Sequence, residues 1–236
     1  MSFRLFNLAW EEAPIVVIDV ETTGLVPGAD AAVQVALVRF EKREVVGRFS
    51  SLVNPGRKIP KEATAIHGIT DKKVAKVSTI DAIFDFASVR ELLKGAQPAA
   101  YNAHFDQRFV VARAFEDWTW PWLDPLVAVR AVDRYVRGEG RHKLEAACAR
   151  RSIPLVGAHD AAADAEATGW LLYHVFSEVA QIVDQSLGTV LAWQRRTEAD
   201  QWANFNKWRS EQHEAEAAKA KAAEGPKKRP KQERAR

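Results

Sequence analysis

Two acidic residues stand at the end of a strongly apolar segment near the start of the chain. Five of the six residues from Ile15 to Val20 are apolar, which predicts a strand buried on both faces, and the exception is Asp19. Glu21 follows two residues later, so both carboxylates point to the same side if the strand extends that far. Such a pair repels unless a cation lies between the two groups, and oxygen ligands suit a hard ion such as Mg²⁺ or Mn²⁺. Two solvated acids at a strand end are the alternative that this pair leaves open.

Three further segments place residues of the same chemical kind near expected element ends. Asp106 follows a short expected strand, close to a helix start. His159 precedes a helix and Asp164 lies in its first turns, so a loop histidine can fold back beside a helical acid. His67 is expected in a loop just before Gly68. Taken singly, these residues also fit helix-start acids favoured by the helix dipole and a turn histidine.

The apolar patterns predict the elements that must position these residues. The short connections between the first three strands predict an antiparallel meander, and the alternating helices and strands that follow predict an α/β domain with a mixed sheet. Strands are expected at 15–20, 33–40, 45–53 and within 97–102; helices are expected from Ser78 or Asp81 to Lys94, at about 105–116, from Pro125 onward behind the cap Asp124, after His142, and at about 161–183.

The composition fits one domain with an extension. The 236 residues are 47% hydrophobic, which is enough for a core without disulfides. The single cysteine, Cys148, excludes an intrachain disulfide and favours a cytoplasmic location. No apolar run approaches the ~18 residues of a membrane span, and no basic segment leads into an apolar one at the N-terminus. We therefore expect neither a membrane span nor a secretory signal.

The C-terminal part differs in character from the rest. Residues 217–236 contain eight Lys/Arg and two Glu, a net charge of +6, which leaves −3 for residues 1–216 out of the total of +3. We expect a main domain at 1–184, a tryptophan-rich helical extension at 185–222, and a basic tail at 223–236 whose composition predicts disorder.

Taken together, the motifs resemble a known family. Asp19-x-Glu21 with "TTG", "NAxFD" ending in Asp106, and His159-x₄-Asp164 resemble the DEDDh (DnaQ-like) 3′–5′ exonucleases, and among them the epsilon-type proofreading subunits of bacterial DNA polymerase III. The resemblance spans about residues 14–176 and includes "NPGRKIPKEATAIHGIT" and "HKLEAACARRSIP". It implies the ribonuclease H-like exonuclease fold, with a central mixed five-stranded sheet flanked by helices.

The resemblance also implies a chemistry. Asp19, Glu21 and Asp164 are implied to hold a metal that activates water, while Asp19 bridges to a second metal that Asp106 supports. Two Mg²⁺ or Mn²⁺ ions ~3.5–4 Å apart can stabilise both the attacking and the leaving oxygen of a phosphodiester. His159 is implied as the general base, a role that suits a histidine with an unperturbed pKa near ~6.5.

A set of substrate-binding residues follows from the same resemblance. One loop surrounds the terminal nucleotide, a second touches its base or sugar, and a turn presents Asp106; the implied residues are Thr22, Thr23, Leu25, Ile66, His67 and Asn102. The chain departs from the family pattern at Gln34, where an acid is common, and the role of Tyr101 is not assigned. Residues 185–236 have no counterpart in the resemblance.

The sequence thus predicts a metal-dependent 3′–5′ exonuclease that releases nucleoside 5′-monophosphates. Single-stranded DNA is the expected substrate, and a DNA polymerase subunit is a candidate partner for the C-terminal extension. An RNA 3′-end trimming enzyme with the same residues is one alternative. A catalytically silent nucleic-acid-binding or polymerase-accessory module is the other, although retention of all four carboxylates and His159 counts against it.

Overall fold

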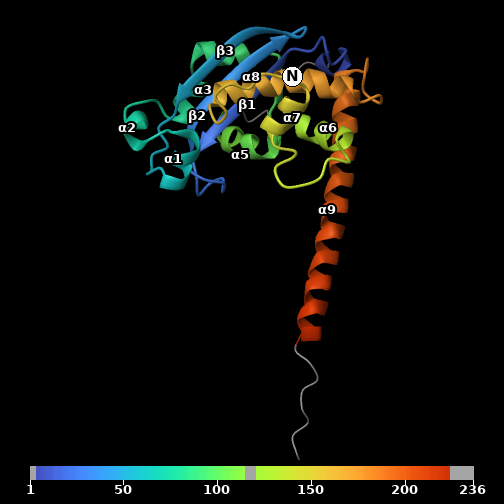
Figure 1. Cartoon of the computed structure of the whole chain (residues 1–236). Coiled ribbons are helices and arrows are strands. Elements are labelled where there is room, and N and C mark those ends of the chain that lie inside the picture. Colours follow the sequence, from blue (N-terminus) through green and yellow to red (C-terminus); the bar gives the residue numbers. More distant parts are fainter. Residues whose placement is uncertain (1–3, 115–120, 224–236) are drawn as a thin grey trace, which may run out of the picture. The chain divides into compact units, whose positions relative to one another are not determined.

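The computed structural model describes residues 4–114 and 121–223. Strands dominate the first part and helices the second, which is the α/β arrangement that the sequence predicts (Figure 1). The elements in chain order are η1 (Leu5–Asn7), β1 (Ile15–Thr22), β2 (Ala32–Glu41), β3 (Glu44–Leu52), α1 (Lys61–His67), α2 (Asp71–Val74), α3 (Ile80–Phe84), α4 (Ala87–Leu93), β4 (Gln97–Ala99), α5 (Ala103–Ala114), α6 (Pro125–Val132), α7 (Leu144–Arg150), α8 (Ala161–Ser177) and α9 (Leu187–Ala223).

The sheet is mixed, with the strand order β3-β2-β1-β4. The pairs β1–β2 and β2–β3 are antiparallel, which confirms the predicted meander, and β4 runs parallel to β1. The register pairs Asp19 with Ala36 and Glu21 with Gln34. Since β4 pairs only with residues 15–17 of β1, the last part of β1 has no strand on that side.

The described residues form four strands and not the five that we expected. The position of the fifth is marked by Leu123, which makes one parallel bridge with Ala99. Its backbone amide donates to the Pro98 carbonyl at 2.9 Å. Pro121 has no N–H to donate, and Asp124 already caps α6, so few residues remain that could extend the ladder. Residues 115–120, which precede this segment, lie outside the described residues.

The two faces of the sheet carry separate helical layers. Ile15 and Val17 of β1 pack with residues of α6, α7 and α8, whereas Val16 and Ile18 pack with residues of α3, α4 and α5. This division follows from the alternation of side chains along a strand. Asp19 has the same parity as Ile15 and Val17, so it points toward the layer that contains α8.

Helix α8 packs closely on β2 because it carries a glycine at the contact. A Cβ on Gly169 would lie 2.2 Å from the ring of Phe40, which is far closer than van der Waals contact allows. The neighbouring Trp170 meets Phe40 edge to face, with 5.3 Å between the ring centroids. This contact fixes the helix whose N-terminal end carries Asp164.

Three helix expectations were wrong in detail. The helix expected up to Lys94 is broken into α3 and α4, because Phe86 has an extended backbone with ψ of 134°. The helix expected at 161–183 ends at Ser177. His67, expected in a loop, is the last residue of α1, which starts after Pro60 and ends at Gly68 with φ of 69°.

The chain divides into two compact units, Met1–Arg195 and Arg196–Arg236. The start of α9 belongs to the first unit, where Trp193 meets Phe176 edge to face at 6.5 Å. In the second unit the Phe205 ring lies 6.0 Å from that of Trp202 and 5.9 Å from that of Trp208. Residues 224–236, most of the expected basic tail, lie outside the described residues. None of the described helices has the length and apolar character needed to cross a membrane.

Candidate active site

The end of β1 combines two carboxylates with an unpaired strand edge. Because β4 ends at Ala99, no strand of the described residues accepts the backbone amide of Val20, and this amide donates instead to Oδ1 of Asp106 at 3.1 Å. Asp106 is 3% exposed and lies in the first turn of α5. The hydrogen bond therefore holds a carboxylate from α5 beside the strand that carries Asp19 and Glu21.

Asp124 positions the start of α5 as well as that of α6. Its side chain accepts from the backbone amide of Leu126 at 2.9 Å, which confirms it as the N-cap of α6. It also accepts from the amides of Asn102 and Ala103, each at 3.0 Å. One buried carboxylate thus satisfies free N–H groups at two helix starts, which stabilises the turn before Asp106.

The start of α9 reaches the same segment through Gln194. Its Oε1 accepts from the backbone amide of Asp124 at 2.8 Å, and its Nε2 donates to the carbonyl of Trp122 at 2.9 Å. The sequence pattern predicts Asp124 as a cap of α6 alone and indicates no role for Gln194. A polar residue in an otherwise apolar helical turn was the available signal for Gln194.

A side-chain network fixes the N-terminal end of α8. Asp160 caps this helix by accepting from the amides of Ala162 and Ala163, as its position in the sequence suggested. Nε2 of Gln34 donates to Oδ2 of Asp160 at 3.2 Å and to Ser50 Oγ at 3.3 Å. Gln34, which departs from the family pattern and lies opposite Glu21, thus connects the cap of α8 with Ser50 of β3.

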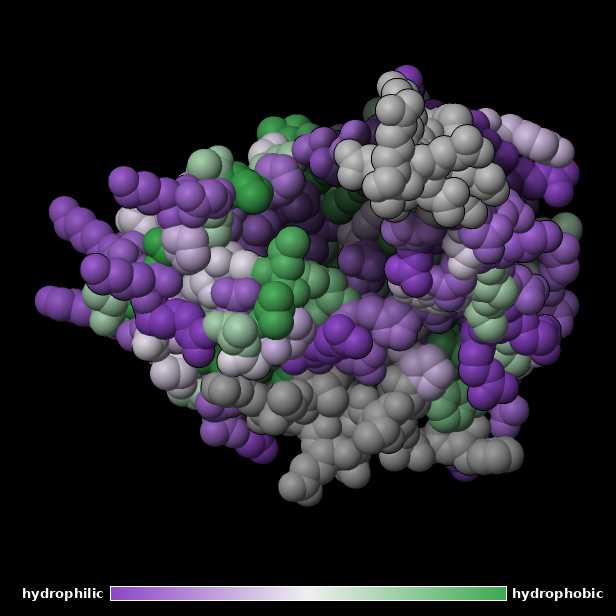
Figure 2. Space-filling model, turned by 90° about the horizontal axis from the view of Figure 1, so that it is seen from below, coloured by the Kyte–Doolittle hydropathy of each residue, from purple (hydrophilic) through white to green (hydrophobic). Residues whose placement is uncertain are grey.

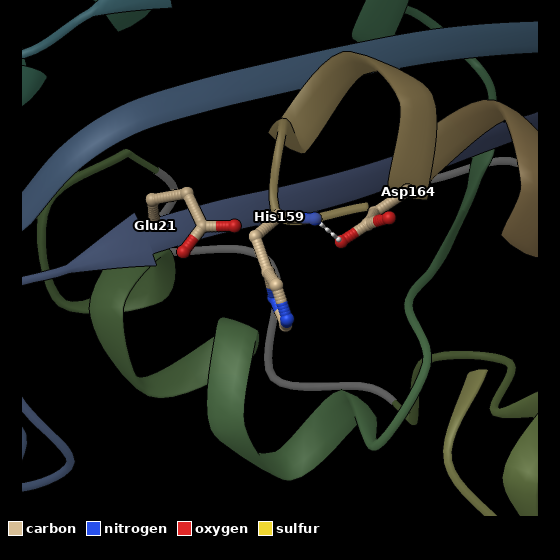
Figure 3. A group of neighbouring side chains, drawn as sticks. All are labelled: Glu21, His159 and Asp164. Carbon is tan, nitrogen blue, oxygen red and sulfur yellow. Dashed lines mark hydrogen bonds between the residues drawn. The ribbon is translucent and has the colours of Figure 1, made fainter. Parts of the chain in front are cut away.

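Glu21, His159 and Asp164 form a compact cluster. One ligand atom from each lies within 4.8 Å of the others. His159 lies between the two carboxylates, with its ring projecting to one side (Figure 3). Its backbone has φ of 67° and its amide donates to Oδ2 of Asp164 at 3.2 Å. The loop histidine and the helical acid therefore come together across five residues of chain.

The acidic groups interact strongly with one another. Burial raises the pKa of Asp19 well above its usual value, and the charges of Asp106, Asp164 and Glu21 raise it further. Burial, followed by the charges of Asp164 and Asp160, raises the pKa of Glu21 to about 8. Burial also raises the pKa of Asp106 and of Asp164, opposed in each case by a backbone hydrogen bond. These shifts place Asp19, Glu21, Asp106 and Asp164 in one electrostatic site.

The donor set fits a divalent cation. Four carboxylates from β1, α5 and α8 surround one region, and a cation there would relieve their mutual repulsion. Oδ1 of Asp164 is buried and has no hydrogen-bond partner among the described residues, as expected for an oxygen reserved for a ligand. The carboxylates thus present the hard oxygen ligands that Mg²⁺ and Mn²⁺ prefer.

The two threonines after Glu21 hold the loop that follows β1. The Thr22 hydroxyl donates to the Gly24 carbonyl at 2.6 Å. The Thr23 hydroxyl donates to Oδ1 of Asp30 at 3.0 Å and accepts from the Ala31 amide at 3.1 Å. Both threonines are buried, so their side chains shape the loop from within.

The remaining residues of the expected substrate site lie on three different segments. Leu25 and Ile66 are exposed apolar side chains, 80% and 60% exposed respectively. The ring of His67 accepts from the Ile69 amide at 3.0 Å. Burial lowers the pKa of His67, opposed by the Thr22 backbone, which places the end of α1 beside the end of β1. Asn102 is exposed and has φ of 64° directly before α5.

Leu25, Ile66 and Asn102 are all exposed, so this part of the site is open to solvent. The carboxyl end of β1 points to the lower edge of the view in Figure 1, between α1 and α5. Figure 2 shows that lower face as mostly hydrophilic, with a small hydrophobic group near its centre and a hollow beside it. A polar, hollowed face with a few exposed apolar groups suits a ligand that has both charged and flat apolar parts.

Comparison with known proteins gives a consistent family. The family model described as "Exonuclease" matches residues 16–172. A "DNA polymerase III subunit epsilon-like protein" of Rhodobacter capsulatus is 38% identical over 170 residues, which cover 67% of this chain and 23% of that protein. A "DNA polymerase III PolC-type" of Latilactobacillus sakei is 32% identical over 187 residues, 77% of this chain and 12% of that protein. The chain therefore spans only a small part of the length of these relatives.

Solved structures of similar fold include two exonucleases. Exonuclease X in complex with 5′ overhanging duplex DNA matches with a TM-score of 0.57 and 25% identity, covering 74% of this chain and 99% of that chain. The zinc-bound complex of E. coli ExoI with single-stranded DNA matches with a TM-score of 0.61 and 25% identity, covering 73% of this chain and 42% of that chain.

Proposed function

This chain belongs to the exonuclease family, and we propose that it is a metal-dependent 3′–5′ exonuclease that releases nucleoside 5′-monophosphates from nucleic-acid 3′ ends. The observation that carries the proposal is the convergence of four carboxylates and a histidine from β1, α5 and the start of α8. No single element supplies this cluster. The fold brings together its members from positions up to 145 residues apart, the separation of Asp19 and Asp164.

The carboxylates would hold the metal ions. Asp19, Glu21 and Asp164 would bind one divalent cation, and Asp19 and Asp106 would support a second. Such ions, Mg²⁺ or Mn²⁺, supply an activated water and stabilise the charge that develops on the attacking and leaving oxygens. The carboxylates of the chain keep their positions through the Val20 amide at Asp106 and the His159 amide at Asp164.

His159 would take a proton from water at this site. Its ring lies within reach of Glu21 and Asp164, and its backbone is fixed by the Asp164 hydrogen bond. A neutral imidazole nitrogen accepts a proton near neutral pH, which is the property that a general base needs. We therefore propose His159 as the general base.

The loop after β1 and the end of α1 would bind the terminal nucleotide. Leu25 and Ile66 are exposed apolar side chains that can contact a base or sugar. The buried hydroxyls of Thr22 and Thr23 stabilise the loop, so its backbone amides are held in place. His67 lies beside the Thr22 backbone and would contact the same nucleotide.

The names of the similar proteins support DNA as the substrate. The similar proteins include DNA polymerase III components, and two exonucleases of similar fold are described as complexes with DNA. We propose single-stranded DNA 3′ ends as the substrate, and a DNA polymerase subunit as a partner of residues 185–222. RNA 3′ ends are the alternative substrate for the same site.

A catalytically silent binding module is a weaker interpretation. Four acidic groups with raised pKa values destabilise the metal-free protein and repel nucleic acid phosphates. A module that only bound nucleic acid would gain by losing any of them. Their joint presence is better explained by metal-dependent hydrolysis.

One assay separates these possibilities. The full chain is incubated with Mg²⁺ and 5′-labelled single-stranded DNA, duplex DNA and RNA of the same sequence, and products are resolved at single-nucleotide length. We expect a ladder shortened from the 3′ end, fastest on single-stranded DNA. Faster shortening of RNA would assign the alternative substrate, and intact strands in all three lanes would support the silent module.

A further inference from the structure

A cavity lies beside the carboxylate cluster, and neither Leu25 nor Ile66 is among the residues that line it. It has a volume of about 410 Å³, within the usual size of a small-ligand site. His159 and Asp164 line it, so it is continuous with the residues proposed for catalysis. Its other walls come from Tyr101 and Asn102, from α6, and from residues 142–145 at the start of α7, where Glu145 adds a carboxylate. Apart from Asn102, none of these wall residues has been given a role in catalysis or nucleotide binding above.

Two cations in this cavity form no ion pair with a carboxylate of the described residues. Arg130, in the last turn of α6, and Lys143, just before α7, are both exposed and line the cavity. Neither forms an ion pair with any residue in the described part of the chain. The nearby Arg150 and Arg151 differ, because both bind Asp133, and Arg151 also binds Glu178. Arg130 and Lys143 are therefore available to an external anion.

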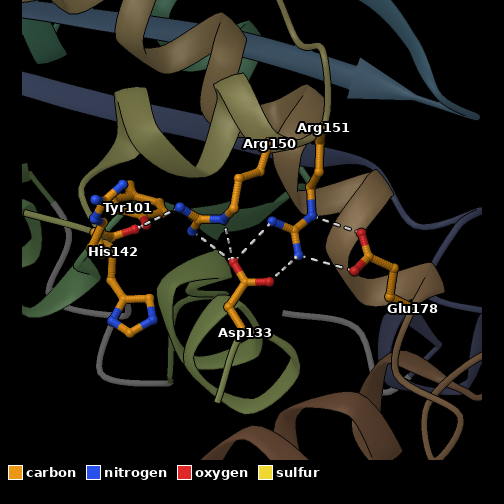
Figure 4. Close-up of polar contacts among 7 residues, drawn as sticks. Tyr101, Asp133, His142, Arg150, Arg151 and Glu178 are labelled. Carbon is orange, nitrogen blue, oxygen red and sulfur yellow. Dashed lines mark hydrogen bonds and ion pairs between the residues drawn. The ribbon is translucent and has the colours of Figure 1, made fainter. Parts of the chain in front are cut away.

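The wall that carries Lys143 is held in place from two sides. The Tyr101 hydroxyl donates to the His142 carbonyl at 2.6 Å, and the Arg150 guanidinium donates to the Arg141 carbonyl at 2.8 Å. Arg150 is itself fixed by Asp133, as Figure 4 shows. The backbone carbonyls of Arg141 and His142, the two residues before Lys143, are thus held in place. A wall fixed in this way can bind a ligand without first becoming ordered.

The cavity also has an apolar part. Leu126 and Leu144 contribute aliphatic side chains, and the ring of Tyr101 contributes an aromatic one. Nε2 of His142 is buried and has no hydrogen-bond partner among the described residues. The cavity therefore offers two cations for an anion, apolar surface for a flat group, and the His142 nitrogen for a specific contact, while Glu145 and Asp164 are the acids in its lining. This combination matches a nucleoside with a phosphate.

We propose that this cavity binds the penultimate nucleotide of the strand, with the 5′-phosphate of that nucleotide on Arg130 and Lys143. The inference rests on the proposed exonuclease function, because the scissile phosphate would lie at Asp164 and His159. The nucleoside on the 5′ side of that bond then occupies the adjoining cavity. The enzyme would thus recognise the last two nucleotides, and the second would be held mainly through its phosphate.

The test uses two small substrates that differ by one phosphate. The thymidine dinucleotides pTpT and TpT share the scissile bond and both nucleosides, but only pTpT has the 5′-phosphate. We expect kcat/KM of the wild-type chain to be about tenfold higher for pTpT, since charged hydrogen bonds have about this strength. In the double variant Arg130→Gln/Lys143→Gln, this ratio should fall to about one.

A matched control removes the same two charges elsewhere. Arg90 and Lys94, in and directly after α4, are exposed and lie on the helical layer of the opposite sheet face. The variant Arg90→Gln/Lys94→Gln should keep the tenfold ratio. Thermal unfolding of both variants checks that the fold is retained.

The possible outcomes separate the inference from the function it rests on. Hydrolysis of both dinucleotides with equal efficiency by the wild-type chain would overturn the cavity assignment and leave the exonuclease proposal intact. A ratio that stays near tenfold in Arg130→Gln/Lys143→Gln would also overturn it. No hydrolysis of either dinucleotide, or of longer strands, would contradict the proposed function itself.

Discussion

The backbone amide of Val20 donates a hydrogen bond to the carboxylate of Asp106 at 3.1 Å, joining a central strand to a helix 86 residues later. The contact exists because β4 ends at Ala99, so that among the described residues this part of β1 pairs with β2 on one side and with no strand on the other. The side chain takes the place of a strand carbonyl. Asp106 therefore has a structural role in addition to the charge that it brings to the site.

Substitutions at Asp106 should separate these two roles. In Asp106→Asn the amide oxygen can still accept from Val20, so the fold should persist while metal-dependent hydrolysis is lost. In Asp106→Leu the buried N–H of Val20 loses its partner. The free energy of unfolding of this variant should be about 1–3 kcal/mol lower than that of Asp106→Asn. Urea unfolding and hydrolysis are measured on both variants. Equal stability of the two would show that the Val20 contact contributes nothing.

The stability of the metal-free protein should decrease as the pH rises. The folded-state pKa of Glu21 is about 8, above the value of about 4.3 for an unfolded chain, so the folded protein binds the extra proton between these pH values. This contribution to stability is therefore fully present below about pH 4 and is lost as the pH rises toward 8. The raised pKa values of Asp19, Asp106 and Asp164 act in the same direction.

Thermal unfolding in the presence of EDTA at several pH values measures this dependence. Glu21→Gln should flatten it, whereas Glu44→Gln, at an exposed residue of β3, should leave it unchanged. Added Mg²⁺ or Mn²⁺ should raise Tm more at pH 8 than at pH 6, because metal binding requires deprotonated carboxylates. A metal-free Tm that rises between pH 5 and pH 8 would contradict the interpretation.

Gln34 should act as a positioning residue for α8. Its side chain donates to Asp160 at 3.2 Å and to Ser50 at 3.3 Å, so Gln34→Leu leaves the helix cap without this link. We expect kcat to fall several-fold while KM for a dinucleotide changes little, because Glu21, His159 and Asp164 lose their alignment. Gln34→Glu tests the charge separately, since it adds a carboxylate beside Asp160. Unaltered kcat in Gln34→Leu would restrict Gln34 to packing.

Removal of the His159 side chain should slow the chemical step and spare metal binding. We expect His159→Ala to lower kcat by about 10²–10⁴, the usual range for a general base. The acidic limb of the pH–rate profile should disappear with it. Metal affinity, measured by calorimetry, should stay close to that of the wild-type chain. A profile that keeps its acidic limb in the variant would exclude His159 as the base.

Local sequence patterns were enough to predict the meander and most helix starts. The apolar run at 15–20 and the Asp124–Pro125 pair each carry a strong local signal, and both elements are present. The shorter elements were less predictable. The break at Phe86 depends on a ring contact with Phe49, and the helix that ends at His67 has only seven residues. Such features are decided by tertiary contacts, which a local pattern does not contain.

The candidate site, like the fold, was predictable from the sequence only in part. The acids of the site were identified from their types and from the resemblance of the motifs. The residues that hold them were not, because their roles come from long-range contacts. Gln34 meets Asp160 across 126 residues, and Gln194 meets Asp124 across 70. Neither separation has a periodicity that could reveal it. The role of Tyr101 likewise depends on a long-range contact, because its hydroxyl donates to the His142 carbonyl.

The most direct measurement compares the wild-type chain with Asp19→Asn on single-stranded DNA labelled at either end, with Mg²⁺ present. The account predicts that the wild-type chain releases labelled nucleoside 5′-monophosphate at once from 3′-labelled strands and gives a progressive ladder from 5′-labelled ones. Asp19→Asn should do neither, while its unfolding temperature equals or exceeds that of the wild type, because a repelling buried charge is gone. Release of nucleotides from the 5′ end, or activity of Asp19→Asn within tenfold of wild type, would contradict it.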